Sequence, residues 1–256
     1  MNAVLSPPQT QSRSDIEVRR VLEQSPLGAS FAETPNPVTR YLAVELAFVW
    51  DEFVSRLNRV PVVRAVEDGS VSKEQYAALL LNLRQQVIDG GRWIALTASS
   101  MSQELFIIRS ALITNAAEEH RDYQMLEDDY VALGGKRADI ESAEKNIGSE
   151  AFSAFMFQRA AQPDPLDLFG AMFIIEGLGS AKAGLWAKRL QASLGLERAG
   201  VNFLLYHGQN DDNHYNKLRM VLSLPFITET VAKRLVKTAR TVARLYCLQL
   251  EELGNV

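Results

Sequence analysis

Two of the chain's three histidines lie seven residues apart, with an acidic residue between them. His207, Asp211 and His214 form a His-x3-Asp-x2-His spacing. On a helix, offsets of four and seven residues fall within roughly 60° of arc, so the three side chains would share one face. Two imidazoles and a carboxylate form a ligand set suited to iron, manganese or zinc. The alternative to a metal-binding helix face is an exposed loop with an Asx cap, because the segment Gln209–Asn213 is entirely polar.

A lone glutamate, Glu176, interrupts the apolar segment Leu168–Leu178. Burying an unpaired carboxylate costs several kcal/mol, so we expect a compensating partner. A metal ion would compensate this charge, and so would a buried hydrogen bond or ion pair at a helix packing point. The residues alone leave both interpretations open.

A second acidic group follows the apolar run Phe106–Ala117. Glu119 continues the apolar face of this predicted helix, whereas Glu118 does not. Asp122 shares the face of Glu119 to within about 60°, and His120 is rotated from it by about 100°. The alternative interpretation is that this cluster forms the solvated half of an amphipathic helix.

Composition excludes several classes of protein. The 256 residues are 47% apolar and 23% charged, and the net charge is −4, which argues against a nucleic-acid binder or a polybasic membrane-surface protein. Cys247 is the only cysteine, so neither an internal disulfide nor a cysteine-rich zinc site can form. The sequence lacks a nucleophile elbow, a P-loop and a dinucleotide-binding glycine motif.

The N-terminal residues lack the apolar core of a signal peptide, and no apolar run approaches the roughly 18 residues of a membrane span. We therefore expect a cytoplasmic protein that does not associate with a membrane.

Apolar periodicity predicts one all-α domain of about seven helices and gives almost no strand signal. Residues 1–36 are predicted to be a mostly irregular arm with a short helix at Ser14–Gln24, and residues 37–256 the helical domain. The predicted helices are Val38–Asn58, Lys73–Ser99, Gln103–Leu133, Ser149–Ala161, the stretch between Pro165 and Leu194, Asp211–Leu222 and Ile227–Leu253.

Taken in order, the candidate ligands resemble those of the haem-oxygenase-like dimetal oxidases, which share their fold with haem oxygenase, thiaminase II and pyrroloquinoline quinone synthase. The resemblance covers about residues 38–254. It rests on the His207 motif, on the helix segment Ile174–Gly179 around Glu176, and on the Glu118-Glu119 pair in a helix that Ala132-Leu-Gly134 closes.

The resemblance implies that Glu119, Glu176, His207, Asp211 and His214 bind two Fe(II) ions and act in catalysis. By the same resemblance, the reduced pair activates O2 and attacks a small organic substrate held between the helices. Known outcomes in such proteins are N-oxygenation, oxidative C–C cleavage and desaturation.

The sequence departs from this family pattern at two places. Asp122 takes the position where the family usually has a histidine, with His120 nearby on a less favourable face. Gln85 and Gln86 lie on the preceding long helix, where a glutamate ligand is common. An all-oxygen set at one position would suit manganese as well as iron, so we include Asp122 among the metal ligands.

The same residues are also compatible with two other functions. One is a metal-free oxidase like pyrroloquinoline quinone synthase, and the other is a non-catalytic helical binding protein that kept the fold. The expected partners are O2 and a small, partly apolar molecule. Arg84, Arg92 and Lys182 are candidates for pairing with a substrate carboxylate, although a surface position is the usual one for such residues. A homodimer formed through exposed helix faces is the default expectation for oligomeric state.

Overall fold

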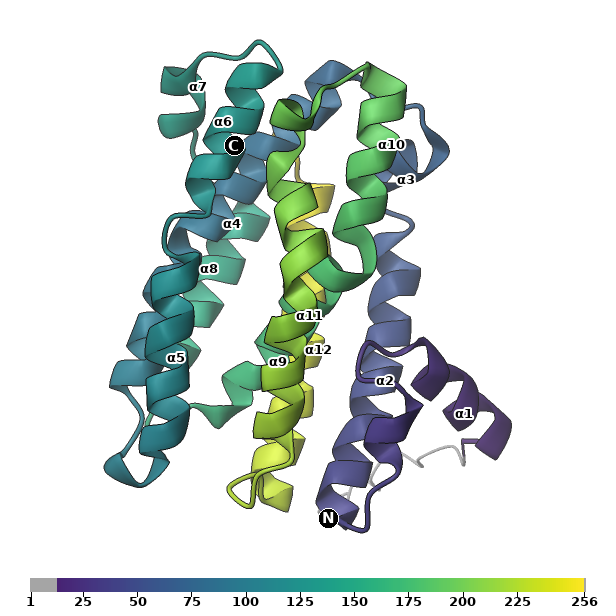
Figure 1. The fold of residues 1–256 in the computed structure, drawn as a ribbon, viewed down its shortest axis with the longest axis vertical. Coiled ribbons are helices and arrows are strands. Elements are labelled where there is room, and N and C mark those ends of the chain that lie inside the picture. The colour runs from purple at the N-terminus through teal and green to yellow at the C-terminus, as the bar shows by residue number, and fades with distance from the viewer. Residues whose placement is uncertain (1–12, 256) are drawn as a thin grey trace, which may run out of the picture.

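The structure is a computed structural model that describes residues 13–255, except for the side chains of residues 210–214. Within this part of the chain all regular structure is helical, and the long helices lie side by side in a bundle (Figure 1). The α-helices are α1 (Asp15–Gln24), α2 (Pro37–Leu57), α3 (Pro61–Asp68), α4 (Lys73–Ser99), α5 (Phe106–Glu119), α6 (Tyr123–Ala132), α7 (Arg137–Glu141), α8 (Ile147–Ala160), α9 (Phe169–Leu178), α10 (Gly184–Leu194), α11 (Asn202–Leu222) and α12 (Glu229–Glu251).

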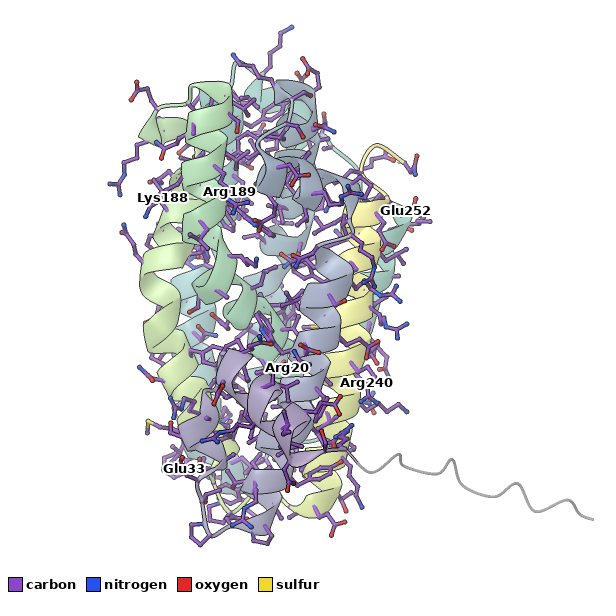
Figure 2. All side chains as sticks on the ribbon, turned by 90° about the vertical axis from the view of Figure 1, so that its right-hand side faces the viewer. Arg20, Glu33, Lys188, Arg189, Arg240 and Glu252 are labelled. Atoms are coloured by element: carbon purple, nitrogen blue, oxygen red, sulfur yellow. The ribbon has the colours of Figure 1, made fainter. Side chains whose placement is uncertain are left out.

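Helix α12 packs against α2, α8 and α9. Its buried side chains meet an aromatic cluster in which Phe53 lies edge-on to Tyr246 at 6.0 Å between ring centroids, and Trp50 lies edge-on to Phe173 at the same distance. Charged residues such as Lys188 and Arg240 project from the outer surface of the bundle (Figure 2). The apolar faces that the sequence pattern predicts therefore meet in a single core.

Residues 13–36, the described part of the chain before α2, contain α1 and a short 3-10 helix at Ala29–Ala32. Ser14 caps α1, and Val21 and Leu27 are almost completely buried against the bundle. Arg20 forms an ion pair with Asp51 of α2 at 2.8 Å. The short helix predicted at this place is confirmed, and both apolar and ionic contacts hold it on α2.

Helix α4 begins and ends at the residues that the sequence predicts. Ser72 accepts a hydrogen bond from the backbone N–H of Gln75, and the Gln75 side chain accepts one from the Ser72 N–H, which completes a capping box. This local chemistry fixes the start of the helix without help from the rest of the fold.

The predicted number of helices is too small, because helical periodicity continues across breaks in the chain. The helix predicted at Gln103–Leu133 is two helices, α5 and α6, separated by a turn at residues 120–122. The helix predicted after Pro165 contains a π-helical turn at Gly179–Ala183, where its direction changes (Figure 1). If α9 and α10 are counted as one interrupted helix, the described residues contain eleven helices.

The stretch Leu166–Leu194 is, by length and mean hydropathy, apolar enough to cross a membrane, contrary to the expectation from the sequence. Half of its most apolar window is buried inside the bundle. Phe173 and Ile174 are fully buried there. The composition of this stretch is therefore explained by its position in the core of the fold.

Helix α11 begins nine residues before the predicted start, at Asn202. Asp129 of α6, which is wholly buried, accepts hydrogen bonds from the backbone N–H groups of Asn202 at 2.8 Å and Phe203 at 3.0 Å. Nearby, the Tyr76 hydroxyl donates to the carbonyl oxygen of Gly200 at 2.8 Å. The start of α11 is thus set by partners far away in the sequence, which local patterns do not reveal.

Burial raises the pKa of Asp129 from 3.8 to about 7, although the two N–H donors oppose this shift. Between these values the folded protein holds a proton that the unfolded chain has released. The contribution of Asp129 to the free energy of unfolding should therefore fall as the pH rises from about 4 to about 7, and level off above that. Asp129→Asn lacks this titration and keeps one acceptor oxygen.

As the pH rises through this range, we expect the free energy of unfolding of the parent protein to fall relative to that of Asp129→Asn. Urea denaturation of both proteins at several pH values measures it. A difference that stays constant, or that moves in favour of the parent as the pH rises, would contradict the assignment.

Candidate metal centre

Three of the predicted ligands converge in the fold. One ligand atom each from Glu119, Asp122 and His207 lie within 4.8 Å of one another. The Nε2 atom of His207 is 3.4 Å from Oδ2 of Asp122. Metal–ligand bonds of about 2.0–2.2 Å place two ligands of one ion roughly 3–3.5 Å apart. The spacing of the Asp122–His207 pair therefore fits two ligands of a common ion.

The turn between α5 and α6 brings Glu119 and Asp122 together. The Asp122 backbone N–H donates to the carbonyl oxygen of Glu119 at 3.1 Å, and the Asp122 side chain is buried. His120 is exposed, and its two ring nitrogens contact the Ala117 carbonyl at 2.8 Å and the Arg121 guanidinium at 3.2 Å. The structure thus brings Asp122 into the cluster and leaves His120 outside it.

Helix α4 packs directly against this turn. A Cβ atom on Gly91 would lie 2.7 Å from the Cα atom of His120, which no side chain tolerates without movement. The missing side chain at Gly91 therefore allows the backbone of α4 to reach the turn that carries Glu119 and Asp122.

The imidazole of His207 is held in one orientation. Its Nδ1 atom lies 3.0 Å from the carbonyl oxygen of Phe203, one helical turn earlier, and its ring packs on the Phe203 ring with centroids 4.2 Å apart. A carbonyl oxygen only accepts, so Nδ1 donates in this contact. Nε2 is then the ring nitrogen that faces Asp122 and could bind an ion.

A series of contacts connects α6 with α11 and returns to the residue before α6. Asp129 accepts the Phe203 N–H, the Phe203 carbonyl accepts from His207, and His207 contacts Asp122, which directly precedes α6. The sequence pattern does not single out Asp129, because the acidic stretch Glu127-Asp-Asp129 is typical of a solvated helix face.

Glu176 lines the same cavity as Glu119 and His207, and it is partly exposed to that cavity rather than fully buried. The π-helical turn that follows it packs on α11. A Cβ atom on Gly208 would lie 2.7 Å from the backbone nitrogen of Gly184, so the two helices touch backbone to backbone beside His207.

Tyr215 is a further residue that the sequence analysis did not select. Its hydroxyl is buried and lacks a hydrogen-bond partner among the described residues. Burial and the nearby Glu176 carboxylate raise the pKa of its phenol well above the usual value. Its position directly after His214 was the only sequence signal for it.

Asp211 and His214 belong to α11, one and two turns after His207. Their backbone positions share the face of His207, as the spacing predicts for a continuous helix. Their side chains lie outside the described part of the structure, so their role as ligands stays a prediction.

The two glutamines of α4 differ in position. Gln85 is buried and donates to the carbonyl oxygen of Ala143 at 2.6 Å, in the segment before α8. Gln86 lines the cavity and accepts from Nε2 of Gln249 on α12 at 2.5 Å. Gln86 thus occupies a cavity wall, and Gln85 serves packing between helices.

The cationic candidates for substrate binding are engaged elsewhere. Arg84 is buried and pairs with Glu127 at 2.9 Å, and Arg92 pairs with Asp89 at 2.9 Å. Lys182 pairs with Glu67 at 3.2 Å. None of the three lines the cavity at the candidate centre.

This cavity has a volume of about 110 Å³ and lies between α3, α4, α9, α10, α11 and α12. Most of its wall is apolar, including Val66, Leu79, Trp93, Met172, Trp186 and Leu204. The carboxylates of Glu119 and Glu176 and the imidazole of His207 form a polar part of this wall. An ion held there would face a largely dry space, where electrostatic interactions are strong.

The donor chemistry of the cluster fits iron or manganese. Carboxylate oxygens suit hard cations, and imidazole nitrogen suits iron, zinc or copper, so a mixed set favours iron. Three acidic residues, Glu119, Asp122 and Glu176, stand at this site. Bound cations would balance their charge.

Solved structures of known proteins share this fold. A domain of unknown function with a haem oxygenase-like fold from Shewanella denitrificans has a TM-score of 0.74 at 20% identity, over 80% of this chain and 88% of that one. A TenA homologue from Pseudomonas syringae has a TM-score of 0.72 at 13% identity, over 88% and 96%. Haem oxygenase-1 from Synechocystis in complex with haem has a TM-score of 0.58 at 20% identity, over 83% and 92%. The expected haem oxygenase-like fold is confirmed.

No curated protein sequence matches the chain. The profile of a protein family described as iron-containing redox enzymes matches residues 80–247, which include the acidic turn, Glu176 and the His207 motif. The chain therefore belongs to this family of iron-containing redox enzymes, built on the haem oxygenase-like fold.

Proposed function

We propose that the protein is a non-haem di-iron oxidase or oxygenase that acts on a small organic substrate. The observation that carries this proposal is the meeting of Glu119, Asp122 and His207 at a cavity that Glu176 also lines. In this proposal Asp211 and His214 complete the ligand set from α11, and manganese can replace iron at one position.

Each described residue has a physical role in this function. His207 presents Nε2 because its Nδ1–H is fixed on the Phe203 carbonyl. Glu119, Asp122 and Glu176 would hold the ions and offset their positive charge. When bound, reduced iron would supply the electrons for O2 activation.

The protein also controls the surroundings of the reaction. The apolar walls formed by Trp93, Met172 and Trp186 exclude water and hold the substrate beside the centre. The helices that carry the ligands touch through Gly91 and Gly208, which keeps the ligand positions fixed relative to one another.

His207→Ala should weaken Fe(II) binding by at least roughly tenfold, since changes even in the residues that orient metal ligands cost about 10–100-fold. His120→Ala is the matched control, because His120 is exposed and outside the cluster. Anaerobic Fe(II) titration, followed by metal analysis of the desalted proteins, measures the difference. Equal iron binding by His207→Ala and the parent would refute the proposed centre.

The protein loaded with Fe(II) should consume O2 in the presence of a reductant, and Glu176→Gln should lower the rate because it removes a negative charge beside the ions. An oxygen electrode measures both rates, and a strong chelator should abolish them. Unchanged O2 consumption in chelator would instead favour a metal-free oxidase. Absence of O2 consumption in an iron-loaded protein would favour a binding protein.

A further inference from the structure

The cavity beside the proposed centre extends beyond the acidic cluster. Its lining along α4 runs from Leu79 to Ile94, which spans roughly 22 Å at about 1.5 Å per residue. Gly91 packs on His120, so the end near Ile94 adjoins Glu119 and the proposed ions. Apolar side chains of α3, including Val62 and Val66, line the cavity together with Leu79.

A pair of neutral polar groups interrupts the apolar wall between these ends. Gln86 on α4 and Tyr246 on α12 both line the cavity. Apart from the tryptophans, the other hydrogen-bonding side chains among the described lining are Glu119, Glu176 and His207, which belong to the proposed centre. Gln86 lies four residues before Gly90, or roughly 6 Å along the helix axis.

The polar pair is held in place by a buried network. The Gln249 amide donates to Oε1 of Gln86 at 2.5 Å, and the Gln86 amide lies close enough to the Tyr246 phenol to lower its pKa against the effect of burial. Burial raises the pKa of Tyr246, so its phenol keeps its proton and remains a donor. The other oxygen-bearing group of this network, Oε1 of Gln249, is buried and has no partner among the described residues.

The charge of the cavity restricts what can bind beside this pair. No lysine or arginine is found among the described lining residues, whereas two carboxylates are. A buried anion away from the ions would have no counter-charge and would lie near like charges, which costs several kcal/mol. An uncharged oxygen, as in an alcohol or amide, accepts from these donors without that cost.

We propose that Gln86 and Tyr246 form a substrate-binding subsite for an uncharged hydroxyl or carbonyl group, and that the substrate is a neutral molecule with an apolar tail directed toward α3. This assignment rests on the proposed function, because it places the substrate's polar group about one helical turn from the ions. It also explains why α4 carries a glutamine on this wall instead of a charged residue.

Four full-length proteins test the subsite in metal-free form, because a carboxylate probe would otherwise bind iron directly: the parent, Gln86→Leu, Tyr246→Phe and Gln85→Leu. The probes share an eight-carbon chain and are octan-1-ol, octanamide and octanoate. Calorimetry, with Trp93 and Trp186 fluorescence as a second readout, measures affinity, and thermal melts verify that each variant is folded.

The parent should bind octan-1-ol and octanamide at least about tenfold more tightly than octanoate. Gln86→Leu and Tyr246→Phe should each weaken octan-1-ol binding about fivefold, equivalent to the ~1 kcal/mol of one neutral hydrogen bond. Gln85→Leu is the matched control and should bind as the parent does, because Gln85 points to Ala143.

Octanoate binding as tight as that of octan-1-ol would overturn the proposal. So would octan-1-ol affinity that is unchanged in both Gln86→Leu and Tyr246→Phe. Fe(II) titration of the same variants separates this failure from failure of the proposed function. Gln86→Leu should retain iron, and a parent protein that binds the probes but no iron would refute only the di-iron proposal.

Discussion

The buried carboxylate of Asp129 is the contact on which the geometry of the candidate centre depends. It accepts the first free N–H groups of α11 and so fixes where that helix begins and how it is rotated. His207 lies one turn later, and its ring is oriented by the carbonyl of a residue that Asp129 holds. Because Asp122 directly precedes α6 and Asp129 lies within it, one short segment carries both a proposed ligand and the residue that positions His207.

This arrangement explains why an acidic site can persist inside an apolar bundle. Carboxylates gathered without cations repel one another, and helices that could move would separate to relieve that repulsion. Here the backbones of α4 and α11 approach their neighbours at Gly91 and Gly208 too closely for any side chain to intervene. The packing thus holds Glu119 and Asp122 near His207 before any ion binds, which is the preorganisation that tight metal sites require.

Local chemistry made parts of the fold predictable. The capping box at Ser72 is a short-range signal, and α4 begins where this signal places it. The break at residues 120–122 was missed because apolar residues keep their helical spacing across it. The start of α11 was missed because its cap, Asp129, is 73 residues away from Asn202.

The candidate site was also predictable only in part. Residue types and spacing selected Glu119, Glu176 and His207, which the fold brings to one cavity. They could not separate Asp122 from His120, since that depends on a turn, nor Gln85 from Gln86, since that depends on which helices cover α4. Tertiary contacts decide both questions.

The π-helical turn at Gly179–Ala183 has a consequence for how this chain can change in length. A π turn accommodates one residue more than an α turn, so losing one residue there would give a more regular helix. It would also rotate Glu176 by about 100° relative to α10 and Trp186. A deletion that improves local helical geometry would therefore dismantle the cavity, whereas deletions in exposed loops would leave it intact.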